Sequence, residues 1–320
     1  MTFDLALAPS GSVPFDVVGY GESSLDFLAV VPTWPAPDTK VPLRRFIILP
    51  GGQTATAVVA SARLGCRARY VGVFGDDRWG ADIRAAIACS GVDLVAVERR
   101  GVSSRTAVVL VDDAGRRTIL ERRDPRLSLE AGDVDARVFQ SGRILLTDAT
   151  DVRGALRAAR AARQTGTRVM LDVDRPMEDV EGVEALLAEA DVVIAGGEFA
   201  PAYTGRSPMG AALAALEAAH PGKLVISTLG ADGSLARFRG REIRTPARPV
   251  QVVDTTGAGD AFRGGFAARW IAAGGPVPVD ALLEYANAVA GLSCRALGAQ
   301  AALPTSEDVS RLVAGGGPQG

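Results

Sequence analysis

The feature that most constrains the fold is an alternation of short apolar runs with helix-patterned segments along the second half of the chain. Continuously apolar runs are typical of strands that are buried on both faces, because an exposed face would need polar residues at every second position. Strands that alternate with helices pair in parallel, since each helix returns the chain to the same edge of the sheet. We expect strands at 143–149, 168–174, 191–196 and 223–230, and helices at 152–166, 179–190 and 207–220.

The N-terminal part of the chain has a different pattern. Residues 15–31 resemble one strand that continues past two glycines into another, and residues 106–123 resemble a hairpin around Asp-Asp-Ala-Gly. We therefore expect a small β-sheet built from insertions near 20–50 and 100–125. Ligands of open α/β sheets bind at the carboxyl ends of the strands, so a β-sheet placed there would act as a lid.

Composition excludes several classes of protein. The 37 acidic and 35 basic residues nearly balance, so the chain has no basic surface for nucleic acid or an anionic membrane. It has no apolar run long enough to cross a bilayer, and its first residues lack the basic region of a secretory signal. Three cysteines without CxxC spacing and a single histidine, His220, disfavour a disulfide framework, a His-rich metal site and a Ser-His-Asp hydrolase. We expect a cytoplasmic protein with one domain over residues 1–314 and a flexible tail at 315–320.

The nine residues at 254–262 read DTTGAGDAF. Residues 248–254 resemble a strand, and apolar residues at helical spacing follow the motif: Phe262, Phe266 and Trp270. The glycines would therefore lie at a helix N-terminus, where unpaired backbone N–H groups favour an anion such as phosphate. The carboxylate of Asp260 would oppose phosphate, unless it accepts the proton of a hydroxyl that attacks phosphorus. Alternatively Asp260 only caps the helix, and the local pattern does not separate the two.

This motif, followed by GGF at 264–266, resembles the C-terminal signature of the ribokinase-like (PfkB) carbohydrate kinases. Three further regions resemble parts of the same family in the same order: GGQTATAVVASARLG to YVGVFGDDRWG (51–80), STLGADGSL (227–235) and ANAVAGLSCRALGAQAALPT (286–305). The resemblance covers most of the chain. It implies a ribokinase-like fold, a mostly parallel doubly wound α/β sheet flanked by helices with a small β-sheet lid. It also implies transfer of the ATP γ-phosphoryl group to a sugar hydroxyl with Mg²⁺.

The resemblance further assigns roles to individual residues. Asp260 would be the general base, and the N–H groups of Gly257, Ala258 and Gly259 would form an anion hole. The remaining expected contacts are Asp26, Gly51, Gly52, Thr56 and Arg105 for the substrate, Thr228, Gly230, Gly233 and Asn287 for the nucleotide, and Glu198 for the metal. A monovalent cation such as K⁺, in the loops around Asp254 and 294–300, and a homodimer through the lid are also implied.

Two positions depart from the family pattern. Thr56 stands where the family usually has Asn, and it is either a substrate contact or a helix residue without one. The family's Asn-x-x-Glu motif appears as Ala-Gly-Gly-Glu at 195–198, so Glu198 either acts on Mg²⁺ or simply opens a surface helix. These departures resemble the ketohexokinase-like and sulfofructose-kinase-like branches. Arg105 is the best candidate for an anionic sugar group among the hairpin arginines, which alternatively are edge-strand charges.

Several alternatives stay open at this point. Within the family, the substrate could be a nucleoside, a 2-keto-3-deoxy acid or a sulfo-sugar instead of a simple sugar. The chain could also be a catalytically inactive relative that binds a sugar or a nucleotide. A nicotinamide dehydrogenase is disfavoured because the GxGxxG fingerprint is missing.

Overall fold

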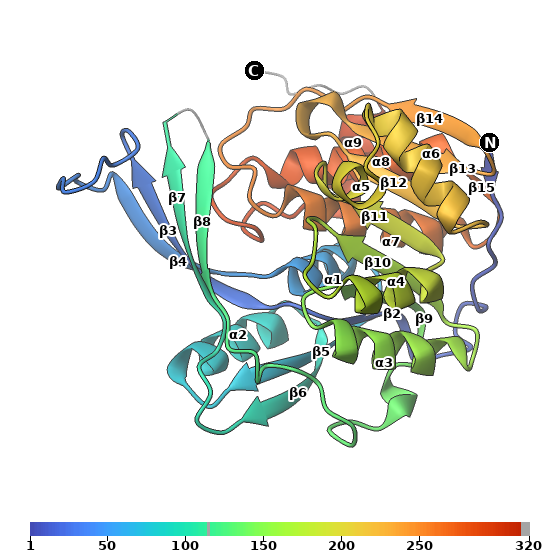
Figure 1. The fold of residues 1–320 in the computed structure, drawn as a ribbon, viewed down its shortest axis with the longest axis horizontal. Coiled ribbons are helices and arrows are strands. Elements are labelled where there is room, and N and C mark those ends of the chain that lie inside the picture. Colours follow the sequence, from blue (N-terminus) through green and yellow to red (C-terminus); the bar gives the residue numbers. More distant parts are fainter. Residues whose placement is uncertain (114–115, 315–320) are drawn as a thin grey trace.

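A nine-stranded sheet forms the centre of the molecule in the computed structural model, which describes residues 1–113 and 116–314 (Figure 1). Its strands are β2 (Phe15–Tyr20), β5 (Ala68–Gly75), β6 (Asp93–Arg99), β9 (Gly142–Asp148), β10 (Arg168–Val173), β11 (Val192–Ala195), β12 (Leu224–Thr228), β13 (Ser234–Phe238) and β14 (Arg241–Thr245). They lie in the order β14-β13-β12-β11-β10-β9-β2-β5-β6. All neighbours from β12 to β6 are parallel, and β13 and β14 add an antiparallel edge. The predicted doubly wound α/β sheet is thereby confirmed.

Helices cover both faces of this sheet (Figure 1). The helices are α1 (Gln53–Arg63), α2 (Arg78–Cys89), α3 (Val152–Arg163), α4 (Val180–Glu189), α5 (Phe199–Thr204), α6 (Met209–Ala219), α7 (Ala258–Ala273), α8 (Val279–Ser293) and α9 (Ser306–Val313). Alternate residues of β9 show the arrangement, because Leu146 packs with α1, α7 and α8 whereas Leu145 packs with α3 and α4. Burial on both faces explains the continuously apolar strands, and every strand and helix expected from 143 to 230 is present.

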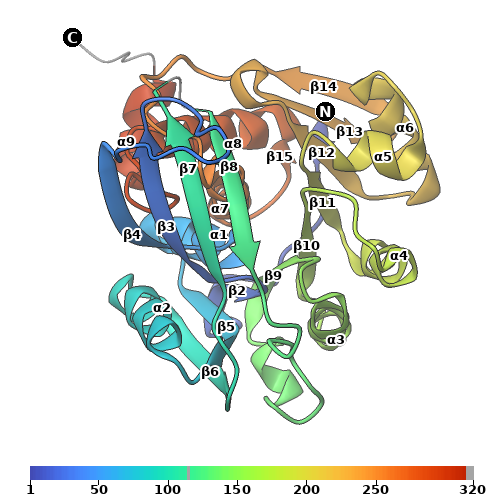
Figure 2. The ribbon, with the colours of Figure 1, turned by 60° about the vertical axis from the view of Figure 1, so that its left-hand side comes forward.

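A second sheet has four strands and is built from the two predicted insertions. It comprises β3 (Ser24–Val31), β4 (Arg45–Gly51), β7 (Thr106–Asp112) and β8 (Arg117–Arg122), in the order β4-β3-β7-β8. Figure 2 shows this sheet standing in front of α1 and α7. A short pair, β1 (Thr2–Phe3) with β15 (Val277–Pro278), joins the N-terminus to α8. Residues 114–115 of the hairpin turn and the predicted tail at 315–320 lie outside the described residues.

The strand expected at 248–254 is wrong. These residues form a loop that runs from β14, at the sheet edge, to the start of α7. Pro246 and Pro249 have no N–H to donate to a sheet ladder. The N–H groups of Val253 and Asp254 both donate to the carbonyl of Cys294, at the end of α8, instead of to a strand. The predicted helix after the glycines is confirmed, because α7 begins at Ala258.

None of the helices in the described part of the chain is long and apolar enough to cross a membrane.

Candidate active site

The glycine motif forms a tight turn at the N-terminus of α7. Gly257 has a left-handed backbone with φ 75°, and a Cβ atom there would lie 2.5 Å from the Cβ of Ala299. Only glycine fits both conditions. The N–H of Ala258 donates to the carbonyl of Thr255 at 3.3 Å, whereas those of Gly257 and Gly259 have no hydrogen-bond partner among the described residues. The turn therefore presents free N–H donors at the positive end of a sixteen-residue helix.

Asp254 holds this turn in place. Its carboxylate is buried and accepts hydrogen bonds from the N–H and the hydroxyl of Thr256, at 2.9 and 2.7 Å. Its second oxygen accepts from the N–H of Gly298, at 2.8 Å. The first residue of the motif thus ties the loop before α7 to the loop after α8, which are the two loops expected to hold a monovalent cation.

The carboxylate of Asp260 lies in the first turn of α7 with only 15% of its side chain exposed. Burial raises its pKa to about 7, the nearby Arg263 lowers it, and the negative charges of Asp174, Asp148 and Asp26 raise it. A carboxylate with a pKa near neutrality accepts a proton from an alcohol better than an ordinary aspartate does. The N-cap residue of this turn is Gly257, which has no side chain to cap the helix, and a carboxylate oxygen of Asp260 lies 3.5 Å from a terminal nitrogen of Arg263.

Two further carboxylates end the neighbouring strands of the central sheet. Asp148 of β9 and Asp172 of β10 are register partners in the parallel ladder, so their side chains lie on the same face. Asp148 accepts hydrogen bonds from the N–H of Glu22 at 2.7 Å and from the hydroxyl of Thr54 at 2.6 Å. Asp172 pairs with the guanidinium of Arg263. The carboxyl edge of the sheet is therefore strongly acidic beneath the start of α7.

Asp26 and Gly51 meet on the inner face of the four-stranded sheet. A Cβ atom on Gly51 would lie 2.1 Å from the carboxylate of Asp26, so the glycine leaves the space that this carboxylate occupies. Ser24 donates to Asp26 at 2.7 Å. Burial raises the pKa of Asp26 to about 6, against the opposing effect of that hydrogen bond, and the charge of Asp254 raises it further. Gly52 follows with φ 95°, packed against the backbone of Ser23, so that the chain can turn into α1.

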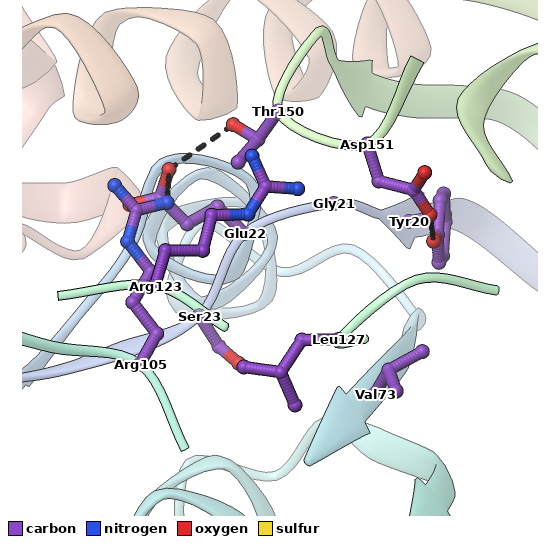
Figure 3. Close-up of a pocket in the computed structure, with 10 residues that line it drawn as sticks. All are labelled: Tyr20, Gly21, Glu22, Ser23, Val73, Arg105, Arg123, Leu127, Thr150 and Asp151. Carbon is purple, nitrogen blue, oxygen red and sulfur yellow. Dashed lines mark hydrogen bonds and ion pairs between the residues drawn. The ribbon is translucent and has the colours of Figure 1, made fainter. Parts of the chain in front are cut away.

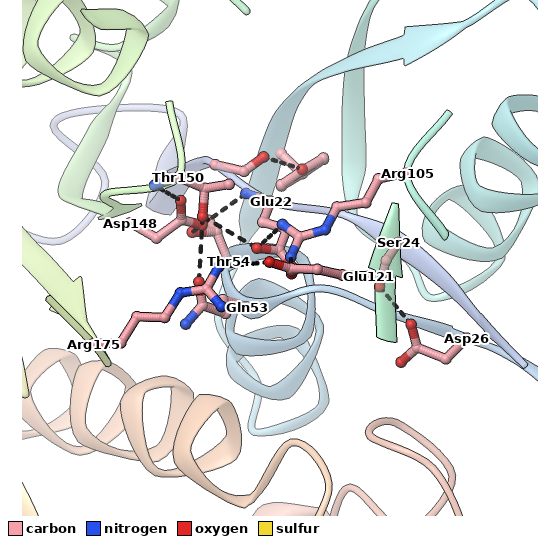
Figure 4. A network of polar contacts seen from close by, with 12 residues as sticks. Glu22, Ser24, Asp26, Gln53, Thr54, Arg105, Glu121, Asp148, Thr150 and Arg175 are labelled. Atoms are coloured by element: carbon pink, nitrogen blue, oxygen red, sulfur yellow. Dashed lines mark hydrogen bonds and ion pairs between the residues drawn. The ribbon is translucent and has the colours of Figure 1, made fainter. Parts of the chain in front are cut away.

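Arg105 forms ion pairs with two carboxylates of this chain. Its guanidinium is buried and pairs with both Glu22 and Glu121, and Arg175 also pairs with Glu121, at 2.7 Å (Figure 4). Burial lowers the pKa of Arg105, an effect that the charge of Glu121 opposes. The alternating charges form a network that connects β7, β8 and the segment after β10. The charge of Arg105 is therefore neutralised by carboxylates of this chain.

A small cavity of about 30 Å³ opens beside this network (Figure 3). Glu22, Arg105 and Thr150 line it on one side, with the Thr150 hydroxyl donating to Glu22 at 3.1 Å. Arg123, directly after β8, also lines the cavity and is exposed to solvent (Figure 3). Arg123 is thus an exposed cation at the rim of this cavity, next to the buried Arg105.

Thr56 lies in α1 and is completely buried. Its hydroxyl accepts a hydrogen bond from Gln300 at 3.2 Å, which joins α1 to the loop after α8. In this state the hydroxyl serves a contact within the protein, and Thr56 exposes no surface to a ligand.

The predicted nucleotide residues lie further along the same sheet edge. Thr228 ends β12, and Gly230 and Gly233 adopt positive φ in the turn that leads into β13. A Cβ on Gly233 would lie 2.1 Å from the carbonyl oxygen of Thr245, so the turn requires glycine. Asn287 of α8 is buried and donates to Ser234 and to the carbonyl of Thr245, both at 3.1 Å. These two hydrogen bonds from the Asn287 amide stabilise the turn between β12 and β13.

Glu198 is exposed where β11 ends and α5 begins, and it makes no capping hydrogen bond. The preceding Gly196 packs tightly against Asp174, the residue after β10, because a Cβ there would lie 2.5 Å from the carbonyl oxygen of Asp174. The described residues contain no group of three or more acidic, histidine or cysteine side chains that could hold a metal ion by themselves.

Sequence reasoning missed Asp148, Asp172, Asp174 and Arg263. A signal was present, because the first three end apolar strand runs, and carboxyl ends of parallel strands meet at one edge of the sheet. Arg263 gave no such signal, since it lies inside a helix pattern and its partner is distant in sequence.

Comparison with known proteins agrees with this geometry. A family model described as "pfkB family carbohydrate kinase" matches residues 15–306. A fructokinase of Klebsiella pneumoniae is 32% identical over 83% of this chain and 92% of its own length. An ATP-dependent ribose-1-phosphate kinase of Halopiger xanaduensis is 31% identical over 92% of this chain and 96% of its own. The crystal structure of a putative ribokinase from Agrobacterium tumefaciens superposes with a TM-score of 0.86, at 26% identity, over 94% of this chain and 97% of its own.

Proposed function

Because the chain belongs to the pfkB family of carbohydrate kinases, we propose that it transfers the γ-phosphoryl group of ATP to a hydroxyl of a sugar, with Asp260 as general base. The observation that carries this proposal is the joint position of a largely buried carboxylate and free N–H donors in one helix turn. Phosphoryl transfer needs positioning and charge stabilisation more than covalent chemistry, and this turn supplies both.

In the proposed step, Asp260 takes the proton of the sugar hydroxyl as its oxygen attacks the γ-phosphorus. The bond from that phosphorus to the β–γ bridging oxygen breaks, and ADP leaves with the electron pair. The N–H groups of Gly257, Ala258 and Gly259 stabilise the negative charge of the migrating group, which requires Ala258 to give up its weak bond to Thr255. Asp260 then returns its proton to solvent.

The geometry also suits a magnesium ion that ATP itself carries. Mg²⁺ keeps several waters and commonly takes phosphate oxygens plus one or two carboxylates, so it does not need a cage of three acidic side chains. We assign Glu198 as the residue that would hold it, through water, beside the turn that contains Thr228 and Gly230. When bound, Mg²⁺ would neutralise charge on the phosphates.

The nucleotide site would be shaped by Thr228, Gly230, Gly233 and Asn287. A K⁺ ion would bind loop carbonyls near Asp254.

We favour a neutral sugar as the acceptor. Asp26 and the backbone at Gly51 and Gly52 would bind its hydroxyls, and the surrounding carboxylates would repel an anion. Arg105 would act through Glu22 and Glu121 by shaping this side of the site instead of pairing with a substrate charge. Thr56 would contribute only if Gln300 released its hydroxyl. A simple hexose such as D-fructose fits these conditions.

A phosphorylated or carboxylated sugar is the second candidate, and Arg123 is the observation in its favour. Its side chain reaches the rim of the substrate-side cavity and is exposed, so it could bind an anionic group. An ADP-release screen separates the two candidates with D-fructose, D-ribose, ribose 1-phosphate and a 2-keto-3-deoxy acid as acceptors. Arg123→Met should abolish a preference for the anionic acceptors and leave turnover of a neutral sugar near the wild-type value.

The role of Asp260 is tested by Asp260→Asn. This variant should retain binding of an ATP analogue but lose about 10²–10⁴-fold in ADP release with the best acceptor. Asp280→Asn is the matched control, because Asp280 is an exposed acid in the first turn of α8. Turnover of Asp260→Asn similar to that of the control would refute the role of Asp260 as base.

The four-stranded sheet would act as the lid of one kinase domain over residues 1–314. Two polar contacts already join β8 to the catalytic side, one from Arg117 to the hydroxyl of Thr255 and one from Glu121 to Arg175.

We further propose that the outer face of the four-stranded sheet mediates a homodimer. Register places four exposed apolar side chains on that face, Phe46, Ile48, Val108 and Leu120. The expected cytoplasmic location stays a prediction.

A further inference from the structure

One buried guanidinium lies between two carboxylates directly beside the candidate base. Arg263 follows Asp260 by three residues on α7, and its side chain is only 6% exposed. One terminal nitrogen pairs with Asp172 of β10, and the other lies 3.5 Å from a carboxylate oxygen of Asp260. The two carboxylates therefore share a single positive charge.

In the described part of the chain the guanidinium has few other polar partners. A cavity of about 10 Å³ borders it, lined in part by Thr54, Thr147 and Asp172. Among the described residues, Nε of Arg263 and the hydroxyl of Thr147 have no hydrogen-bond partner. The cavity has both polar and apolar lining residues and is about the size of one water molecule. The position of the Arg263 charge therefore depends mainly on Asp172 and Asp260.

We propose that Arg263 and Asp172 balance the charge of Asp260 during phosphoryl transfer, an inference that rests on the proposed role of Asp260 as base. Before the reaction, the guanidinium stabilises the ionised carboxylate of Asp260. When Asp260 has taken the proton of the attacking hydroxyl, Asp172 remains as the partner of the guanidinium. Without Asp172, each turnover would leave a buried cation with no counter-ion, which is strongly unfavourable.

The charged groups around Asp260 make the Arg263–Asp172 pair decisive for the ionisation of the Asp260 carboxylate. The carboxylates that face it are Asp172 from β10, Asp174 directly after β10, Asp148 from β9 and Asp26 from β3, and Arg263 from α7 is the cation that opposes them. Burial raises the pKa of Asp172 as well, and contact with Arg263 opposes that rise. Arg263 is accordingly a positioning residue that acts through the base and does not touch the substrate.

The test is a pH titration of ligand-free protein labelled with ¹³C at the aspartate carboxyl carbons. The Asp260 resonance is assigned by its loss in Asp260→Asn. Arg263→Met should raise the titration midpoint of Asp260 by about one pH unit or more, a tenfold change in its ionisation. Asp172→Asn should lower the midpoint, because it removes a negative charge and leaves the guanidinium to Asp260.

The double variant Arg263→Met/Asp172→Asn removes one charge of each sign, so its midpoint should return toward the wild-type value. This variant also guards against misfolding, because it removes both members of the buried Arg263–Asp172 ion pair together. Arg143→Met is the matched control, because Arg143 is a buried arginine near Asp16 at the opposite end of β9. It should leave the Asp260 midpoint unchanged.

Kinetics give a second readout with ATP and D-fructose as the probe acceptor. The acid limb of kcat/KM should move in the same directions as the titration, and Arg263→Lys should restore part of the loss seen in Arg263→Met. A purely structural role for Arg263 would lower activity at every pH without moving the limb. Unchanged midpoints in both single variants, or shifts of the same sign, would overturn the inference. Full activity in Asp260→Asn would instead overturn the role of the base, while the titration results would still stand.

Discussion

At the scale of single residues, the ionised form of Asp260, the proposed general base, opposes the stability of the fold. Its carboxylate is largely buried, and its pKa of about 7 is well above the ordinary value for aspartate. Between the unfolded and folded pKa values the folded protein binds more protons than the unfolded chain, so the contribution to stability is present below pH 4 and is lost as the pH rises through 7. Ionised Asp260 therefore costs stability at the pH where a base is useful.

This relation predicts that Asp260→Asn stabilises the fold above pH 7. The neutral amide removes a buried negative charge while Arg263 keeps Asp172 as its partner. We expect a gain of about 1–3 kcal/mol in the free energy of unfolding at pH 8, since one pKa unit corresponds to about 1.4 kcal/mol. Urea denaturation at pH 8 and at pH 5 measures it. The gain should shrink at the lower pH, and an equal or larger gain at pH 5 would contradict the assigned pKa.

Three residues that we predict to contact a ligand form polar contacts within the chain in this structure. Arg105 pairs with Glu22. Thr56 accepts a hydrogen bond from Gln300, and Asn287 donates one to Ser234. None of these partners could be identified from the sequence, because each lies between 53 and 244 residues away along the chain. Their proposed roles in ligand binding stay predictions.

At the scale of elements, α7 is shaped by glycine at both ends. Gly257 precedes it and Gly274 follows it, and both have left-handed φ values, 75° and 65°. They differ in their surroundings, because a Cβ on Gly257 would lie 2.5 Å from Ala299, whereas nothing lies within 4 Å of a Cβ on Gly274. The start of α7 is therefore a close-packed turn, and its end is an open one.

This difference predicts unequal effects of two identical substitutions. Gly274→Ala should cost only the backbone strain, about 1 kcal/mol. Gly257→Ala adds a clash that moves the N–H donors, so it should cost about 2–4 kcal/mol and lower kcat at least tenfold. Thermal unfolding and ADP release measure the pair. Equal losses of activity in both variants would show that the turn before Ala258 has no special role.

At the scale of the whole molecule, the outer face of the four-stranded sheet carries the exposed apolar side chains through which we propose a homodimer. Isolated exposed apolar side chains are common, but four on one face of a narrow sheet are typical of an interface. Edge strands β4 and β8 would also be protected by such a contact.

Leu120→Lys should therefore convert a homodimer into monomers. The Leu120 side chain is 58% exposed in the single chain and lies on edge strand β8, directly opposite Val108. Val180→Lys is the control, because Val180 is 64% exposed on α4, away from this face. Light scattering coupled to size-exclusion chromatography measures both. A wild-type monomer, or a dimer that survives Leu120→Lys, would contradict an interface on this face.

Sequence by itself determined the parallel sheet, the helices α3, α4 and α6, the insertions of the second sheet and the helix that follows Gly257. These depend on local periodicity and on glycine, whose effects act within a few residues. Only tertiary structure decided that 248–254 is a loop, and that Asp148, Asp172 and Arg263 gather beside Asp260. Charges interact through space, so the electrostatic environment of a base depends on strands and helices that are distant along the chain.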